Sequence, residues 1–232
     1  MDQFFKPNPK HMITRKTILL AMLFPVIYCA AQAQAPSFQP DLSNFNLWTL
    51  SGRTIVSVVD GSREAVKFNA AKGNGLYLLN DFEFKEGSIE FDVKGKNVDG
   101  RSFVGVAFHV QNDSTYDGIY LRPFNFVNAD TIRRWRAVQY IVHPKFPWFN
   151  LRENFPGKYE NKVKPVPNPD EWFHVKITVF GKNVQVVVNG ATEACLRVEK
   201  LSTYQSGKIA LWVGEGSDGS FANLSIRAAK TP

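Results

Sequence analysis

Apolar and polar residues alternate over long parts of this chain. In residues 173–179 every second residue is apolar, and the polar positions between them include His174 and Lys176. After a turn at residues 181–183 the same alternation continues through residues 184–188. A period of two residues is typical of a β-strand with one buried face, and a short turn with Gly and Asn joins such strands. This segment therefore predicts a β-hairpin with one side exposed to water.

Similar short runs, rich in β-branched and aromatic residues, recur along the chain with Gly, Asn, Asp or Pro between them. They predict eleven strands, at residues 46–51, 64–70, 75–80, 87–93, 103–110, 118–124, 137–142, 173–181, 183–190, 208–214 and 221–227. No window shows a sustained apolar period of 3.6 residues over a helical length. The pattern predicts one all-β domain in which antiparallel strands form a two-sheet sandwich.

Residues 125–170 depart from this pattern. One short strand aside, the segment holds six prolines together with Trp135, Trp148 and Tyr159. Long loops in a compact domain are more often functional than idle. We therefore expect one long loop region, rich in proline and aromatic residues, to contribute to a site.

The N-terminus has the features of a secretory signal peptide. Arg15 and Lys16 precede an apolar run at residues 17–28, and an A-x-A cleavage signal follows at residues 31–33. The run is shorter than the roughly 20 residues that a permanent membrane helix needs. We expect a signal peptide at residues 1–33, a linker at 34–40 and the folded domain at 41–232, in a periplasmic or secreted protein. Lipoprotein anchoring through Cys29 is disfavoured because Tyr28 precedes it.

Cleavage after Ala33 changes both the charge and the cysteine count. It removes four of the 28 basic residues and one of the 21 acidic residues, so the formal net charge falls from +7 to +4. A mildly basic domain of this kind gives no argument for nucleic-acid binding. Cys195 becomes the sole cysteine, so we expect no internal disulfide and a fold held by its core alone.

Five segments of the chain carry a family resemblance. They are GSIEFDVKGKN, SFVGVAFHV, YDGIYLRPFNF, EWFHVKITVFGKNVQVVVNG and SGKIALWVGEGSDGSFANLSI, within residues 41–227. In this order they resemble the concanavalin A-like lectin and glucanase superfamily. The nearest resemblance is to the bacterial jelly-roll domains linked to 3-keto-disaccharide hydrolases, and laminin-G-like domains are also similar. The resemblance implies a jelly-roll sandwich and contact with carbohydrate, while the same fold hosts lectins, adhesion modules, glucanases and lyases.

The sequence departs from the family-16 glucanases of this fold. Those enzymes carry Glu-x-Asp-x-x-Glu on one strand, whereas here Glu90 and Asp92 are followed by Lys94 and Gly95 without a second Glu at that spacing. A two-carboxylate glycosidase mechanism through this motif is therefore unsupported. We expect Glu90 and Asp92 to face solvent on a half-buried strand.

Strand alternation selects the face of the sheet that would meet a ligand. If the aliphatic residues of 103–110 and 118–124 face the core, the opposite face carries small residues together with Phe103, His109, Tyr120 and Arg122. Small residues within a strand leave room for a ligand to approach the sheet. We expect this concave face to bind glycan, unless the long loop covers it.

Aromatic and arginine side chains supply further candidates for contact with sugar. Sugar rings stack on aromatic rings, and guanidinium groups pair with carboxylate or sulfate through two hydrogen bonds, which makes an acidic glycan an attractive ligand. The remaining candidates for substrate binding are Arg134, Arg136, Tyr140, His143, Trp148 and Trp212.

Candidates for acid or base chemistry are few. We expect His109 first, then Glu215 or Asp218, with Arg122 positioning the substrate. The histidines lack metal-ligand spacing, so neither a metal site nor another cofactor is predicted. The run at residues 214–220 could offer oxygen ligands to calcium, although a Gly, Ser and Asp run is more often a turn.

Three functions remain open at this point. The first is a glycoside hydrolase-like enzyme acting on an oligosaccharide or polysaccharide at the concave sheet. The second is a non-catalytic carbohydrate-binding or adhesion domain that uses the same surface. The third is a structural protein of the cell envelope.

The N-terminal pattern generates a direct prediction about processing. Protein recovered from the envelope or the medium should have the mass of a chain that begins near residue 34, because signal peptidase cuts after a small-residue motif. Mass spectrometry of the intact protein measures this. A full-length N-terminus retained in the cytosol would contradict export.

Overall fold

The structure is a computed structural model that describes residues 1–3 and 37–229. The signal-peptide prediction falls almost wholly outside these residues. Within them, none of the helices has the length and apolar character that a membrane span requires.

The described residues form fourteen strands and four short helical segments. The strands are β1 (Trp48–Ser51), β2 (Ile55–Asp60), β3 (Arg63–Phe68), β4 (Gly75–Leu79), β5 (Gly87–Lys94), β6 (Val104–Asn112), β7 (Thr115–Leu121), β8 (Val138–His143), β9 (Glu160–Asn161), β10 (Trp172–Phe180), β11 (Asn183–Val188), β12 (Leu196–Glu199), β13 (Lys208–Val213) and β14 (Gly219–Ala228). The helical segments are η1 (Phe45–Leu47), η2 (Pro123–Asn125), α1 (Thr131–Arg134) and α2 (Trp148–Asn154).

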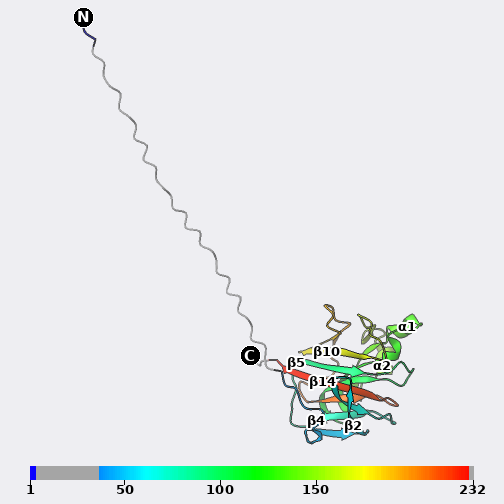
Figure 1. Cartoon of the computed structure of the whole chain (residues 1–232). Helices are drawn as coiled ribbons and strands as arrows, with labels where there is room; N and C mark the ends of the chain where they lie inside the picture. The colour runs from blue at the N-terminus through cyan, green and yellow to red at the C-terminus, as the bar shows by residue number, and fades with distance from the viewer. Residues whose placement is uncertain (4–36, 230–232) are drawn as a thin grey trace. The chain divides into compact units, whose positions relative to one another are not determined.

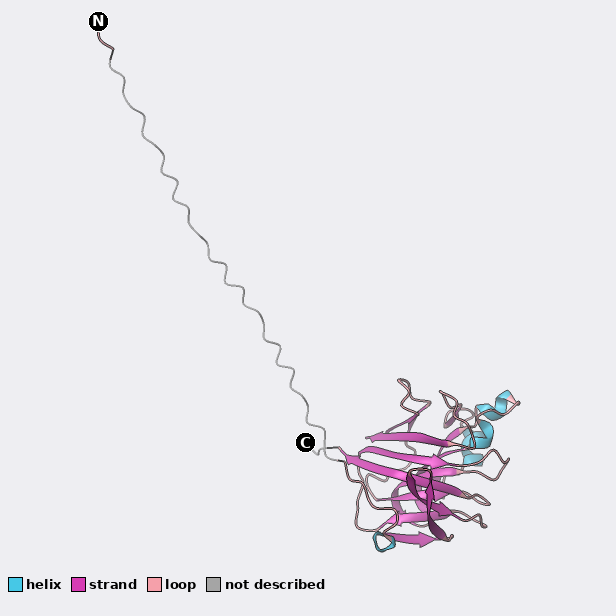
Figure 2. Ribbon diagram, in the orientation of Figure 1, coloured by secondary structure: helices cyan, strands magenta, loops and turns pink. Residues whose placement is uncertain are grey.

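The strands make two antiparallel sheets of seven strands each. The front sheet has the order β1-β4-β13-β6-β7-β8-β9, and the back sheet has the order β12-β11-β10-β5-β14-β3-β2. Figure 2 shows that strands dominate the fold, and Figure 1 shows α1 and α2 together at one end of the sandwich. The predicted jelly-roll sandwich of the concanavalin A-like type is confirmed.

The core lies between the sheets because strand alternation sends the aliphatic and aromatic residues inward. On β5, Ile89, Phe91 and Val93 are fully buried, while Glu90 and Asp92 between them face outward, as the sequence predicts. The predicted hairpin is also present, as β10 paired with β11. Its outward side is polar, and Lys176 there forms an ion pair with Glu90.

All eleven predicted strands are present, and three further strands were not predicted. The edge strand β2 exposes Val56 and Val59, so its apolar residues do not mark a buried face. Strand β9, at an edge of the front sheet, has only two residues. Strand β12 has four residues and lies at the edge of the back sheet opposite to β2. Short edge strands carry little periodic signal because neighbouring strands, rather than their own pattern, position them.

The prediction that His109 shares an outward face with Gly105 and Ala107 is wrong. The pairing of β6 with β7 shifts register between Phe108 and Asn112, and His109 has a positive φ of 49°. A bulge of this kind breaks the alternation of the strand. It places the His109 imidazole in a buried polar cluster with Asp117 on the inner side of the front sheet, where it is inaccessible to a ligand.

The cluster around His109 joins the front sheet to the segment after β12. The Lys200 ammonium lies 2.8 Å from His109 Nδ1 and 4.0 Å from the Asp117 carboxylate, and it donates to the carbonyl of Tyr204 at 2.6 Å. The Tyr140 hydroxyl donates to Asp117 at 2.5 Å. Because Nδ1 accepts from an ammonium group, the N–H of the ring is at Nε2, which lies 2.8 Å from the Lys85 carbonyl.

Burial and the Asp117 carboxylate shift the pKa values of Lys200 and Tyr140 in this cluster. Burial lowers the pKa of Lys200, and the nearby Asp117 opposes that shift. Burial and the Asp117 carboxylate together raise the pKa of the Tyr140 hydroxyl. Asp117 and Lys200 are both excluded from water, so each depends on the other for charge neutralisation.

Replacing Lys200 with Met should lower the free energy of unfolding by about 3–5 kcal/mol, because Asp117 would remain buried without a cation. Urea unfolding measures the change. Lys182→Met, which alters an exposed turn residue, serves as the control. The double variant Lys200→Met with Asp117→Asn should recover part of the loss. A loss of less than 1 kcal/mol for Lys200→Met would contradict this account.

Candidate functional site

The centre of the outward face of the front sheet is filled by the side chains of the protein itself. Gly105 lies between Trp212 of β13 and Tyr120 of β7 in the ladder, and the two rings meet above it with centroids 5.0 Å apart. The Tyr116 hydroxyl accepts a hydrogen bond from the indole of Trp212 at 2.9 Å. The expectation that the sheet is open above Gly105 is therefore wrong, because long aromatic side chains on neighbouring strands close over the small residues.

A pocket of about 200 Å³ opens beyond these rings, at the α1 and α2 end of the front sheet. Four arginines, three aromatic residues, one carboxylate, one amide and one glycine line it. They are Arg122, Arg133, Arg136, Arg152, Phe103, Phe124, Trp148, Asp99, Asn125 and Gly100.

The arginines reach the pocket from four places in the fold. Arg122 follows the last residue of β7, Arg133 belongs to α1, Arg136 connects α1 to β8, and Arg152 lies in α2. The long loop region therefore supplies three of the four guanidinium groups, which agrees with the expectation that this loop contributes to a site. Asp130 caps the first turn of α1 through the backbone N–H of Ile132, at 2.8 Å.

Glu160 of β9 holds three of these arginines behind the pocket. Arg152 donates to both of its carboxylate oxygens, at 3.0 and 2.7 Å. Arg136 and Arg122 lie within 3.8 and 3.9 Å of the same carboxylate. Glu160 is only 8% exposed, so three cations share one buried anion.

Arg122 is part of the pocket wall rather than a free binding group. It is 5% exposed and donates to the carbonyl of Arg136 at 2.7 Å and to the Tyr120 hydroxyl at 2.6 Å. Its guanidinium also lies 4.8 Å from the centre of the Tyr120 ring. Burial lowers the pKa of Arg122.

Trp148 supplies an aromatic surface at the pocket. The residue is 44% exposed, and the guanidinium of Arg152, one helical turn later in α2, lies 4.7 Å from its ring centre. Phe149 is also exposed but does not line the pocket. A sugar ring could stack on the accessible part of the indole.

The charges around the pocket do not balance. Asp99 forms an ion pair with Arg133, and Glu160 neutralises one of the remaining three arginines, so four cations face two anions. Among the described residues, the guanidinium of Arg136 donates no hydrogen bond to another protein group. The arrangement can therefore accept an anionic group and offer it hydrogen bonds.

The structure brings together only part of the predicted substrate-binding set. Phe103, Arg122, Arg136 and Trp148 line the pocket. Tyr120 packs beneath Arg122, and Trp212 and His143 lie farther along the filled face. Arg134 donates to the carbonyls of Asn128 and Ala129. Tyr140 points into the core. Tyr140 is fully buried, so the expectation that it stacks on a sugar is wrong.

The three residues predicted as catalytic lie outside the pocket. His109 is buried between the sheets. Glu215 is exposed in the loop between β13 and β14, where it lines a separate hollow with Lys72 and Arg101. Asp218 forms an ion pair with Lys96 at 2.7 Å. The pocket therefore does not assemble them into an acid and base pair.

The described part of the chain shows no group of three or more His, Cys, Asp or Glu side chains arranged around a metal ion. In the loop that could offer ligands to calcium, Lys96 engages Asp218, and the Ser217 hydroxyl accepts from the backbone N–H of Phe103. These contacts order the loop, and calcium binding there stays a prediction.

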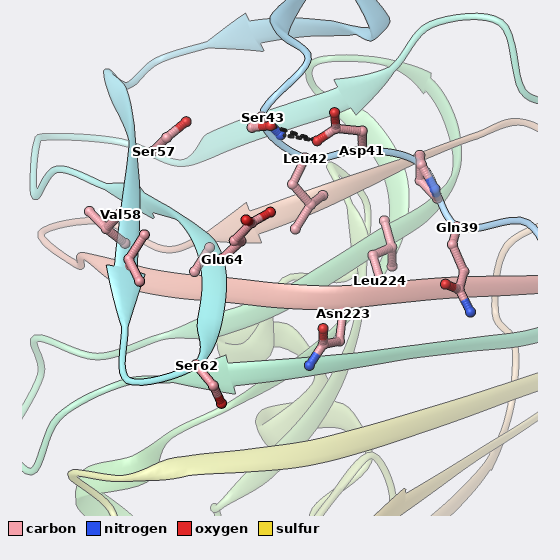
Figure 3. A pocket seen from close by; sticks show the side chains of 13 residues that line it. Gln39, Asp41, Leu42, Ser43, Ser57, Val58, Ser62, Glu64, Asn223 and Leu224 are labelled. Carbon is pink, nitrogen blue, oxygen red and sulfur yellow. Dashed lines mark hydrogen bonds between the residues drawn. The ribbon is translucent and has the colours of Figure 1, made fainter.

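A second and larger hollow lies on the back sheet (Figure 3), with a volume of about 720 Å³. It forms because β14 pairs with β3 only up to Ala222, and a bulge follows in which Asn223 has a φ of 53°. Residues 39–43, the β2–β3 hairpin and Leu224 complete its walls. Glu64 and Asp41 both line it, but it has no aromatic residue and no cationic side chain. It lacks the features that favour sugar binding in the arginine pocket.

Sequence reasoning missed Glu160 and Asn125. Glu160 follows the predicted loop aromatic Tyr159 and has no motif of its own, and its partners Arg122 and Arg136 are 38 and 24 positions away in the sequence. Asn125 sits in the segment RPFNF, which carried the family resemblance without marking this residue. The clustering of arginines in residues 133–152 was the one available signal.

Comparison with a family model shows where this chain belongs. The model of the 3-keto-alpha-glucoside-1,2-lyase-like domain matches residues 38–227. The protein therefore belongs to this family, and the predicted resemblance is confirmed. No protein of curated function matches the chain in sequence.

Solved structures with the same fold include proteins that bind or act on carbohydrate. The carbohydrate-binding module CBM66 from Bacillus subtilis is 15% identical with a TM-score of 0.58, over 82% of this chain and 100% of that one. The VIP36 exoplasmic/lumenal domain in its Ca²⁺/Man3GlcNAc-bound form is 12% identical with a TM-score of 0.52, over 84% and 89%. A putative glycosyl hydrolase from Parabacteroides distasonis is 15% identical with a TM-score of 0.50, over 80% and 90%. These likenesses show the fold, and family and fold together support a glycan-related function.

Proposed function

We propose that this protein is a carbohydrate-binding domain that recognises anionic groups of a glycan in the arginine pocket. The single observation that carries the proposal is the surplus of guanidinium groups, with four arginines facing two carboxylates around a pocket of about 200 Å³. A uronate carboxylate or a sugar sulfate supplies the missing negative charge and two or more acceptor oxygens.

Part of the pocket wall presents hydrogen-bond donors that are already ordered. Arg122 and Arg152 are held by Glu160 and by hydrogen bonds within the protein, so a ligand meets these two side chains in fixed positions. Ordered donors lose less conformational freedom on binding, which favours affinity. Trp148 at the same pocket offers an apolar surface to a sugar ring, so one wall binds charge and another binds the ring.

The family description favours a second candidate, an enzyme that acts on glycans at the same pocket. Elimination across C1 and C2 of a 3-keto sugar would pass the C2 proton, which the neighbouring ketone makes acidic, to a base, and negative charge would develop on the ketone oxygen. The arginines would stabilise that charge. The C1–C2 double bond would then form as the C1–O bond breaks, and the leaving oxygen would take up a proton. We favour binding because His109, Glu215 and Asp218 lie outside the pocket and Glu160 is bound to arginines. Release of sugar from a 3-keto-α-glucoside by the purified protein would favour the enzyme.

We further propose that the protein works outside the cytoplasm, as a periplasmic or secreted protein. The support is the signal-peptide pattern at residues 1–33, because such a segment directs a chain out of the cytoplasm.

Replacing Arg136 with Ala should weaken binding of an oligogalacturonate by about 10- to 100-fold, since one charge-assisted contact would be lost. Titration calorimetry measures the affinity, with a neutral galacto-oligosaccharide as the reference ligand. Arg134→Ala is the matched control, because Arg134 lies two residues away and binds only backbone carbonyls. Its affinity should stay within about threefold of the wild type. Equal affinities for all three proteins, with unchanged melting curves, would sink the proposed site.

The aromatic wall gives a second prediction. Trp148→Ala should reduce affinity for the acidic oligosaccharide by about five- to tenfold through lost stacking, and Phe149→Ala should leave it nearly unchanged. Both residues are exposed on α2, and only Trp148 lines the pocket. Because Trp148 also covers Arg152, each variant is compared with the wild type in a melting curve. Equal losses from the two variants would show that the helix as a whole, rather than the Trp148 ring, is responsible.

A further inference from the structure

Asn125 is a polar residue in the wall of the arginine pocket whose hydrogen bonds are incomplete. It ends η2, is 3% exposed and lines the pocket. Its amide nitrogen donates to the carbonyl of Arg136 at 3.2 Å. Its Oδ1 atom is buried and accepts no hydrogen bond from any described residue. Buried acceptors are nearly always paired, so this one calls for a donor from outside the protein chain.

The chemistry of the surrounding wall identifies the kind of partner. The side chains that line the pocket are otherwise donors or hydrocarbon, apart from Asp99, which is engaged by Arg133. A bare anion such as sulfate or acetate could satisfy the guanidinium groups, but it has no proton to give to Oδ1 of Asn125. A sugar acid has both an anionic group and hydroxyl donors.

A ligand can reach Oδ1 of Asn125 only if a neighbouring side chain moves, and Arg133 and Arg136 line the same pocket. The side chains of Arg133 and Arg136 are about one third exposed, with exposed fractions of 35% and 36%. Long side chains of this kind can shift when they take an anion, whereas the buried Arg122 cannot. Binding of the anionic group and uncovering of Oδ1 would then be coupled.

We infer that Asn125 is a specificity-determining residue that accepts a hydrogen bond from a ligand hydroxyl, so that the pocket selects a sugar acid over a bare anion. The pocket volume of about 200 Å³ suits one sugar ring. This inference rests on the proposed function, since it assumes that the arginines bind the anionic group.

The test compares glucuronate, its monodeoxy analogues and acetate by NMR titration. With the wild type, loss of one particular hydroxyl should weaken binding by about five- to tenfold. Asn125→Ala should weaken glucuronate binding by a similar factor, and the same monodeoxy analogue should then lose nothing further, because the two changes remove one contact. Acetate should bind the wild type and Asn125→Ala equally, within about twofold.

Each possible result bears on a different claim. If Asn125→Ala weakens acetate and glucuronate alike, the residue only positions Arg136 through its carbonyl, and the inference is overturned. If the variant does not fold, the analogue series on the wild type decides, and a series without any loss above twofold overturns the inference. If neither glucuronate nor acetate binds the wild type, and no acidic oligosaccharide does so, the proposed function itself fails.

Discussion

The carboxylate of Glu160 binds three guanidinium groups, and the rest of the pocket depends on that contact. Glu160 belongs to a two-residue strand at the edge of the front sheet. Its carboxylate nevertheless forms ion pairs with Arg122 after β7, Arg136 before β8 and Arg152 in α2. Like charges this close repel one another, and a shared buried anion is what allows them to converge. The surplus of positive charge that remains is a property of this whole set and not of any one residue.

The sheets and their alternation were predictable from sequence because each strand carries its own periodic pattern. The hairpin of β10 and β11 and the outward position of Glu90 and Asp92 follow from that pattern alone. His109 shows where the method fails. A single bulge between Phe108 and Asn112 turns the His109 side chain to the opposite face of the sheet. The residue types in that stretch do not predict a bulge. Strand alternation therefore predicted the sandwich correctly, but it placed His109, the first catalytic candidate, on the outer face of the front sheet instead of the inner face.

The pocket was predictable in part, for a related reason. The loop arginines and Trp148 stood out by type and by their crowding in one segment, so Arg136 and Trp148 were identified. Glu160 and Asn125 act through partners that only tertiary folding brings near, and neither lies in a local pattern. Tyr140 was misplaced because an aromatic residue on a strand has two faces to choose from, and here its hydroxyl pairs with the buried Asp117. Side-chain chemistry can be read from sequence, whereas long-range pairing cannot.

The rings of Tyr116, Tyr120 and Trp212 that close over Gly105 have a consequence for the evolution of this fold. They fill a face of the sheet that would otherwise be open along its length. No space is left at the backbone beneath them, because a Cβ atom at Gly105 would collide with the carbonyl of Ile119. A small residue in place of Tyr120 would uncover part of this face, but it would also remove the hydroxyl that accepts a hydrogen bond from Arg122 at 2.6 Å. The filled face and the arginine pocket are therefore linked, and a change that opens one disturbs the other.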